Sequence, residues 1–245
     1  LSLDYTGGRT EVAGDREVSE ALAHALDTGS EDRDRLTHGF HTYPARMHWA
    51  TAARVLEAFG KKGEHVVDPF CGSGTVLVEA RVHGLASTGI DLNPLAVELS
   101  RLKSDPMDGP HRAALAELGT ELRARSEERV QARDPVRANL PKHEIGWYDT
   151  HVLKEMAGLL EEIRQVEDTR LRTALTLVFS SLIVKFSRQR SDTSSQMVER
   201  HLRKGLVSEF FERKSFELSD RLRDLEAESI GPRPRVVEGD ARDLP

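Results

Sequence analysis

The sequence contains one cysteine, Cys71, few aromatic residues and no long uninterrupted apolar stretch. A single cysteine excludes an internal disulfide and fits a reducing compartment. A membrane-spanning helix needs roughly 20 consecutive apolar residues, and neither such a run nor a signal peptide is apparent. The formal net charge of −6 argues against attraction of nucleic acid over the whole surface, so any such contact requires a local basic patch. These absences predict a cytoplasmic protein, and no metal site is expected.

The 245 residues are enough to bury a substantial core, as one large domain or as a domain with an insertion. Charged residues make up 31% of the chain, but apolar residues recur periodically, which favours a globular protein over a disordered one. The chain starts at Leu1 and stops at Pro245, immediately after a predicted strand. We therefore expect it to be part of a longer protein.

Residues 66–75 read Val-Val-Asp-Pro-Phe-Cys-Gly-Ser-Gly-Thr and predict a strand, a glycine loop and the start of a helix. Gly72 and Gly74 allow a sharp turn and a close approach of the backbone to a ligand. A second short strand, 87–90, ends at Asp91. Ligands of open α/β sheets bind beyond the carboxyl ends of the strands, so Asp91 is placed to accept the two hydroxyls of a ribose.

Segments 68–75 and 89–94 together resemble the S-adenosylmethionine site of class I methyltransferases. The resemblance is strongest to the branch that methylates exocyclic amino groups of nucleic-acid bases, and it covers roughly residues 37–103 and 235–243. It implies an α/β fold with a Rossmann-like doubly wound sheet. It also implies methyl transfer to adenine or cytosine of DNA, with the target base flipped out of the duplex, as in restriction-modification or other defence systems.

The resemblance implies roles for particular residues. Asp91 would hold the ribose, backbone donors of residues 70–74 the amino-acid end, and Asp240 the adenine amino group, with Leu92 as part of an apolar wall. For Asp240, an acidic turn after an edge strand is the alternative, and packing before a helix is the alternative for Tyr43. The implied cofactor-binding residues are Tyr43, Pro44, Ala45, Asp68, Pro69, Phe70, Cys71, Gly72, Ser73, Gly74, Thr75, Asp91, Leu92, Asn93, Asp240 and Ala241.

The catalytic loop of the resembled family, Asp/Ser/Asn-Pro-Pro-Tyr/Phe/Trp, is absent, because no Pro-Pro pair occurs in the sequence. We expect the catalytic residues after Pro245, in a C-terminal segment or in a second chain. This chain alone is then expected to hold cofactor without catalysing transfer. Two alternatives stay open: an RNA base methyltransferase of the same fold, and a non-catalytic, cofactor-holding subunit of a split methyltransferase.

The chain is expected to have three parts. Residues 1–107 form the N-terminal segment and the first part of the methyltransferase domain, and residues 232–245 return to its sheet. Between them, residues 108–231 lack strand alternation and predict a helical insertion between the second and third strands. Helices are expected at 49–59, 95–103, 113–133, 152–166, 169–186 and 207–229, and the later strand at 235–238.

The helical part contains a stretch, 185–196, in which basic side chains alternate with hydroxyls and amides. Arginine can attract phosphates or bind guanine, and serine and threonine can donate to phosphate oxygens. Arg188, Arg190, Ser191 and Thr193 are therefore the predicted DNA-contacting residues. The alternative is a solvated polar loop with a helix cap.

Overall fold

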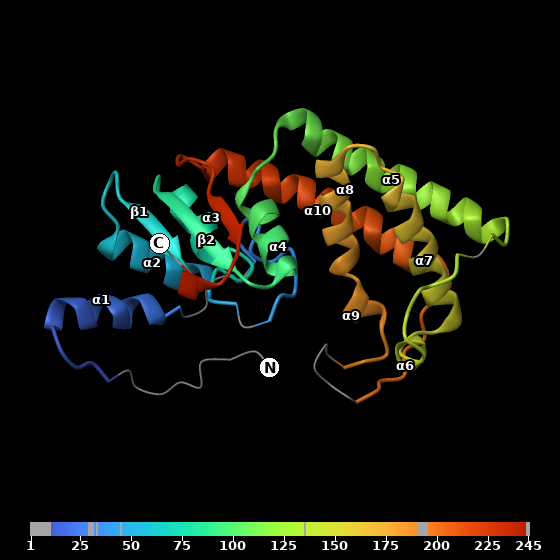
Figure 1. The fold of residues 1–245 in the computed structure, drawn as a ribbon, viewed down its shortest axis with the longest axis horizontal. Helices are drawn as coiled ribbons and strands as arrows, with labels where there is room; N and C mark the ends of the chain where they lie inside the picture. The colour runs from blue at the N-terminus through green and yellow to red at the C-terminus, as the bar shows by residue number, and fades with distance from the viewer. Residues whose placement is uncertain are drawn as a thin grey trace. The chain divides into compact units, whose positions relative to one another are not determined.

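The computed structural model describes residues 11–28, 32, 34–44, 46–134, 136–190 and 196–243. The chain divides into two compact units, the first made of residues 1–107 and 221–245 and the second of residues 108–220. Figure 1 labels the α-helices of both units. Within the described ranges, no helix combines the length and the apolar character that crossing a bilayer requires.

The first unit contains a small parallel sheet of three strands, β1 (His65–Asp68), β2 (Ala86–Asp91) and β3 (Arg235–Glu238). Their order is β1-β2-β3, and the strands lie side by side in Figure 1, where β1 and β2 are labelled and β3 is the red arrow beside β2. Asp68 pairs in register with Gly89, and Asp91 pairs with Glu238. The carboxyl end of β1 thus lies two residues before those of β2 and β3, so residues far apart in sequence meet at one edge of the sheet. The parallel sheet and its helices confirm the predicted mixed α/β character.

The helices of this unit are α1 (Arg16–Leu26), α2 (Trp49–Phe59), α3 (Thr75–Val82) and α4 (Pro94–Ser104), followed by the short η1 (Ala241–Asp243). Helix α4 begins at Pro94 because Asn93 accepts a hydrogen bond from the Leu95 amide at 3.0 Å and proline suits the first helical turn. Helix α3 packs on β1 and β2, and α4 packs on β2 and β3. Leu77, Val78 and Ala80 of α3 are fully buried, so this helix is central to the core.

The second unit is helical in its described part: α5 (Gly109–Gln131), α6 (Lys142–Ile145), α7 (Thr150–Arg164), α8 (Thr169–Ser180), α9 (Ile183–Phe186) and most of α10 (Leu206–Glu228). Helices α5, α7 and α8 pack against one another. Leu115, Leu122, Leu159 and Leu175 supply fully buried side chains to this core. The expected helix at 113–133 begins earlier, because Asp108 accepts a hydrogen bond from the His111 amide at 2.9 Å and caps the helix.

The single helix expected at 169–186 is wrong, because α8 ends at Ser180 and α9 begins at Ile183. At the break, the Ser181 hydroxyl donates to the carbonyl of Val178 at 2.6 Å, and the Leu182 amide donates to Phe179 at 3.0 Å. Hydroxyl side chains compete in this way with the regular helical hydrogen bonds. The apolar periodicity continues across the break and conceals it in the sequence.

Candidate cofactor site

The loop between β1 and α3 contains two glycines with a left-handed backbone conformation. Gly72 has φ +49° and Gly74 has φ +83°. A Cβ on Gly74 would lie 2.8 Å from Ser100 Oγ, so a side chain there meets both strain and a clash. The Ser100 hydroxyl donates to the Gly72 carbonyl at 2.9 Å, and α4 thereby holds the loop in place.

Asp91 connects three segments at the carboxyl ends of the strands. Its carboxylate accepts from the Gly72 amide at 2.9 Å through Oδ2 and from the Asn93 amide at 2.8 Å through Oδ1. Its backbone carbonyl accepts from the Gly239 amide at 3.1 Å. A carboxylate has about four acceptor positions, so each Asp91 oxygen retains capacity for one further donor.

Asp68 and Tyr43 flank the same loop. Asp68 Oδ1 accepts from the Phe70 amide at 3.1 Å; burial raises the pKa of this carboxyl, with the nearby Asp91 charge adding and the Phe70 bond opposing. The Tyr43 hydroxyl accepts from Asn93 Nδ2 at 3.3 Å. Its Cε1 atom lies 3.5 Å from the position of a Cβ on Gly72, so the ring lies against the glycine loop.

Apolar side chains follow both strand tips. Phe70 is 79% exposed and Leu92 is 65% exposed, each within a few residues of a carboxylate. Exposed apolar rings and chains beside hydrogen-bond acceptors are typical of sites for amphipathic ligands. Pro44 and Pro69 are among the described residues, whereas the predicted Ala45 lies outside them.

Several predicted donors and acceptors of this site already have partners within the protein. The amides of Phe70, Cys71 and Gly72 donate to the Asp68 side chain, the Ile90 carbonyl and the Asp91 side chain, respectively.

Asp240 begins the turn that contains Ala241, and its carboxylate accepts from the Arg242 amide and from Arg242 Nε, each at 3.0 Å. The Arg242 side chain is 88% exposed. A ligand would therefore have to use the remaining acceptor positions of Asp240 or displace the exposed Arg242 side chain.

A buried lysine of α4 forms a hydrogen bond with the loop between β1 and α3, a contact that the sequence did not predict. Lys103 is fully buried, and its ammonium donates to Ser73 Oγ at 3.2 Å. Burial, together with the positive charges of Arg46 and Arg221, lowers the pKa of Lys103 from 10.5 to about 7. A lysine three residues after Ser100 on an apolar helix face is the only sequence signal for this contact.

A second buried polar pair joins Glu79 of α3 to His38, which precedes α2. Glu79 Oε1 is 2.7 Å from Nε2 of His38, and Arg35 Nη1 approaches the same carboxyl at 3.4 Å. Burial raises the pKa of Glu79 to about 7, and burial lowers the pKa of His38 well below its usual value. The His38–Glu79 contact is therefore a hydrogen bond in which neither charged form is favoured.

The predicted DNA-contacting residues lie in the second unit. Arg188 pairs with Asp149, and Arg190 Nη1 donates to Gln196 Oε1 at 3.2 Å. Ser191 and Thr193 lie outside the described residues. A phosphate would have to displace Asp149 from Arg188, and DNA contact by this stretch stays a prediction.

Comparison with known proteins adds independent information. A family model described as DNA methylase matches residues 19–101. Three type II methyltransferases are similar: M.MvaI of Kocuria varians, 28% identical over 173 residues; M.MjaII of Methanocaldococcus jannaschii, 33% over 100 residues; and M.BsoBI of Geobacillus stearothermophilus, 30% over 81 residues. These matches cover 68%, 38% and 33% of this chain, but only 37%, 19% and 16% of the relatives. No solved structure matches the chain significantly.

Proposed function

We propose that the protein transfers a methyl group from S-adenosylmethionine to an exocyclic amine of a DNA base, and the match of residues 19–101 to a DNA methylase family model supports this proposal. The base is adenine or cytosine, and the setting is a restriction-modification or other defence system. The names of the type II relatives support DNA over RNA as the substrate.

The observation that carries the proposal is the position of the Asp91 carboxylate. It lies at the common carboxyl edge of three parallel strands, the usual ligand edge of such sheets. Two backbone amides fix it, and one acceptor position remains on each oxygen. Two free acceptors on one fixed carboxylate fit the two adjacent hydroxyls of a ribose.

The remaining residues fit the same cofactor. Gly72 and Gly74 remove side chains where the amino-acid end would lie, the exposed Phe70 and Leu92 supply an apolar wall for adenine, and Asp240 supplies an acceptor for its amino group. When bound, S-adenosylmethionine supplies an activated methyl group on a sulfonium. The protein has to hold the cofactor rigidly and align it with the amine, because alignment provides much of the rate acceleration in such transfers.

We propose further that the three strands belong to a Rossmann-like doubly wound sheet and that the helices between β2 and β3 are an insertion in it. No Pro-Pro pair occurs in the 245 residues. A C-terminal segment or a second chain is proposed to bring the Pro-Pro-aromatic loop that binds the target amine.

The ribose assignment is tested by Asp91→Ala and Asp91→Asn, with Glu57→Ala on the exposed face of α2 as a control for loss of one surface carboxylate. Hydrogen bonds to a charged group contribute about 1.5–3 kcal/mol each, so Asp91→Ala should abolish measurable binding of S-adenosylmethionine by calorimetry. Asp91→Asn should weaken it at least about tenfold. Unchanged affinity in Asp91→Ala, with the unfolding temperature preserved, would refute the assignment.

The activity is tested by incubating duplex DNA with the full-length protein and S-adenosylmethionine carrying a deuterated methyl group, followed by mass spectrometry of the nucleosides. The expected product is labelled N6-methyladenine or N4-methylcytosine. Label recovered only in RNA would favour the RNA methyltransferase alternative. Cofactor binding without label transfer to either would favour the non-catalytic subunit.

Neutralising Arg188 and Arg190 together tests the predicted DNA-contacting stretch. If both arginines reach phosphates, the double glutamine variant should bind DNA more weakly. The magnitude of the slope of log K against log[salt] should then decrease by about 2. An unmoved slope, measured by fluorescence anisotropy, would place this stretch away from the DNA.

A further inference from the structure

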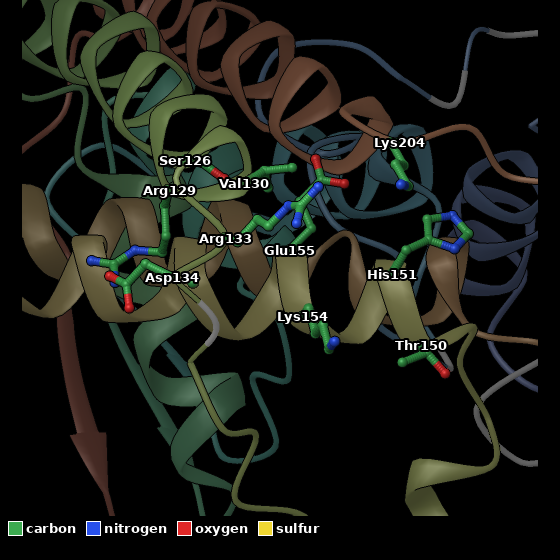
Figure 2. Close-up of a pocket in the computed structure, with 11 residues that line it drawn as sticks. Ser126, Arg129, Val130, Arg133, Asp134, Thr150, His151, Lys154, Glu155 and Lys204 are labelled. Carbon is green, nitrogen blue, oxygen red and sulfur yellow. The ribbon is translucent and has the colours of Figure 1, made fainter.

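The second unit contains a pocket of about 490 Å³ between the end of α5, the first half of α7 and the segment that precedes α10. This volume is within the range of small-ligand sites. In Figure 2, Arg129 lies beside Asp134 on one side, Lys204 lies near His151 on the other, and Arg133 lies between these pairs. The lining also includes Ser126, Val130, Thr150, Lys154, Glu155 and Gly158.

The acidic residues of the pocket have their charges compensated within the protein. Asp134 pairs with Arg129 at 2.6 Å, and Arg129 also pairs with Glu162. Glu155 is buried and accepts from the Ser208 amide at 2.9 Å and from the Gly205 amide at 3.1 Å. The Glu155 carboxylate thus caps the start of α10, where negative charge is favourable.

Three cations of the lining remain without such compensation. Within the part of the chain that the structure describes, Arg133, Lys154 and Lys204 form no ion pair, and all three are exposed. By contrast, Arg188 is paired with Asp149, and Arg203, next to Lys204, is paired with Glu209. A ligand anion can reach the three pocket cations without first breaking an ion pair.

The backbone holds one of these cations in an unusual conformation. Arg133 has φ +54°, the left-handed region that most side chains avoid. Its amide donates to the Val130 carbonyl at 3.3 Å, and the next amide, of Asp134, donates to Arg129 at 3.1 Å, which ends α5. Glycine or asparagine is the usual residue at such a helix end, so an arginine there costs more backbone strain than glycine would.

We infer that this pocket binds a phosphate group of the DNA backbone. The inference rests on the proposed function for the choice of DNA. Arginine and lysine are the usual partners of phosphate oxygens, and the Thr150 hydroxyl can donate to a third oxygen. Such a contact positions the duplex and carries no sequence information. Its chemistry is shared with free phosphate, so the source of the phosphate needs separate measurement.

The test compares the wild-type chain with Arg133→Gln/Lys204→Gln. DNA affinity is measured by anisotropy from low to moderate salt. Each lost phosphate contact lowers the magnitude of the salt slope by about 0.9, so the double variant should lose one to two contacts and bind about tenfold or more weakly at low salt. The matched control is Arg164→Gln, which removes one cation of the same unit that pairs with Glu161 at 3.3 Å outside the pocket. It should leave the slope near the wild-type value.

Parallel titrations with inorganic phosphate and with adenosine monophosphate, followed by NMR shifts of the His151 ring, separate the two sources. One outcome would overturn DNA as the source of the phosphate and leave a site for small phosphates. In that outcome, the small anions shift the His151 signals of the wild type but not of the double variant, while the double variant binds DNA with the affinity and salt slope of the wild type. If the wild-type protein binds S-adenosylmethionine and phosphate but no DNA, DNA is refuted as the substrate and as the source of the phosphate, and only phosphate binding by the pocket stands. Absence of any slope change and of any shift would overturn the inference.

Discussion

Replacing Lys103 by methionine should stabilise the protein near neutral pH and lose this advantage in alkaline solution. The lysine side chain is fully buried, and its ammonium has Ser73 Oγ as its one hydrogen-bonding side chain among the described residues. Burial lowers its pKa from 10.5 to about 7. One pKa unit corresponds to about 1.4 kcal/mol, so keeping the ammonium charged inside the fold costs at most about 5 kcal/mol.

The pH dependence of the stability follows from the different pH values at which Lys103 loses its proton in the folded and in the unfolded chain. Below about pH 7 the lysine is protonated in the folded and the unfolded chain, and the whole cost is present. Between about pH 7 and 10.5 the folded chain has lost the proton while the unfolded chain keeps it, so the stability of the wild type rises with pH. Methionine has a similar volume and no charge, and it forgoes only the hydrogen bond to Ser73, about 1 kcal/mol.

The free energy of unfolding of the Lys103→Met variant should therefore exceed that of the wild type by up to about 4 kcal/mol at pH 6.5. The two should approach equal stability by pH 10. Urea unfolding followed by circular dichroism at four pH values measures this difference, and Lys61→Met on the exposed surface of the same unit is the control. The raised pKa of Glu79 makes stability fall between about pH 4.5 and 7, but this contribution is common to both proteins and cancels. A difference that does not vary with pH, or a less stable variant at pH 6.5, would refute the reasoning.

Three further outcomes are expected. Gly74→Ala should destabilise the first unit by about 1–3 kcal/mol in urea unfolding, because it combines a positive φ with a 2.8 Å approach to Ser100. Gly119→Ala should also lower the free energy of unfolding, because the new Cβ would lie 2.6 Å from Cβ of Ser215 and this clash outweighs the helix-favouring effect of alanine. A more stable variant would contradict the close approach of α5 and α10 at this position. Burial raises the pKa of Cys71 to about 11, so iodoacetamide at pH 8 should label this thiol far more slowly in the folded protein than in urea, and equal rates would disprove its burial.

Local chemistry made much of the cofactor site predictable. The apolar pair before Asp68 predicts a strand, and the glycines after it predict a tight loop, because glycine adopts positive φ values such as those of Gly72 and Gly74 at the lowest steric cost. The α2 bounds, 49–59, and the β3 bounds, 235–238, agree with the expectation for the same reason: apolar periodicity and flanking breakers act over a few residues. The comparisons confirm the family suggested by the same stretch.

Contacts between distant segments were beyond reach of such patterns. Lys103 reaches Ser73 only because α4 packs beside the loop, and the amide of Gly72 reaches Asp91 only because β1 and β2 pair in register. At the interruption after α8, the Ser181 hydroxyl donates to the Val178 carbonyl, and no periodicity in the sequence reveals this choice of partner.

The sequence by itself therefore determined the local conformations around residues 66–75 and 89–94 and, through them, the family and the expected cofactor. Only the tertiary structure decided which charges are buried, which are paired and which are free for a ligand. Examples are the pKa of Lys103, the pairing of Arg188, and the lack of an ion pair for Arg133 and Lys204 among the described residues. The physical reason is that backbone preferences act between neighbours in the chain, whereas desolvation and ion pairing depend on neighbours in space.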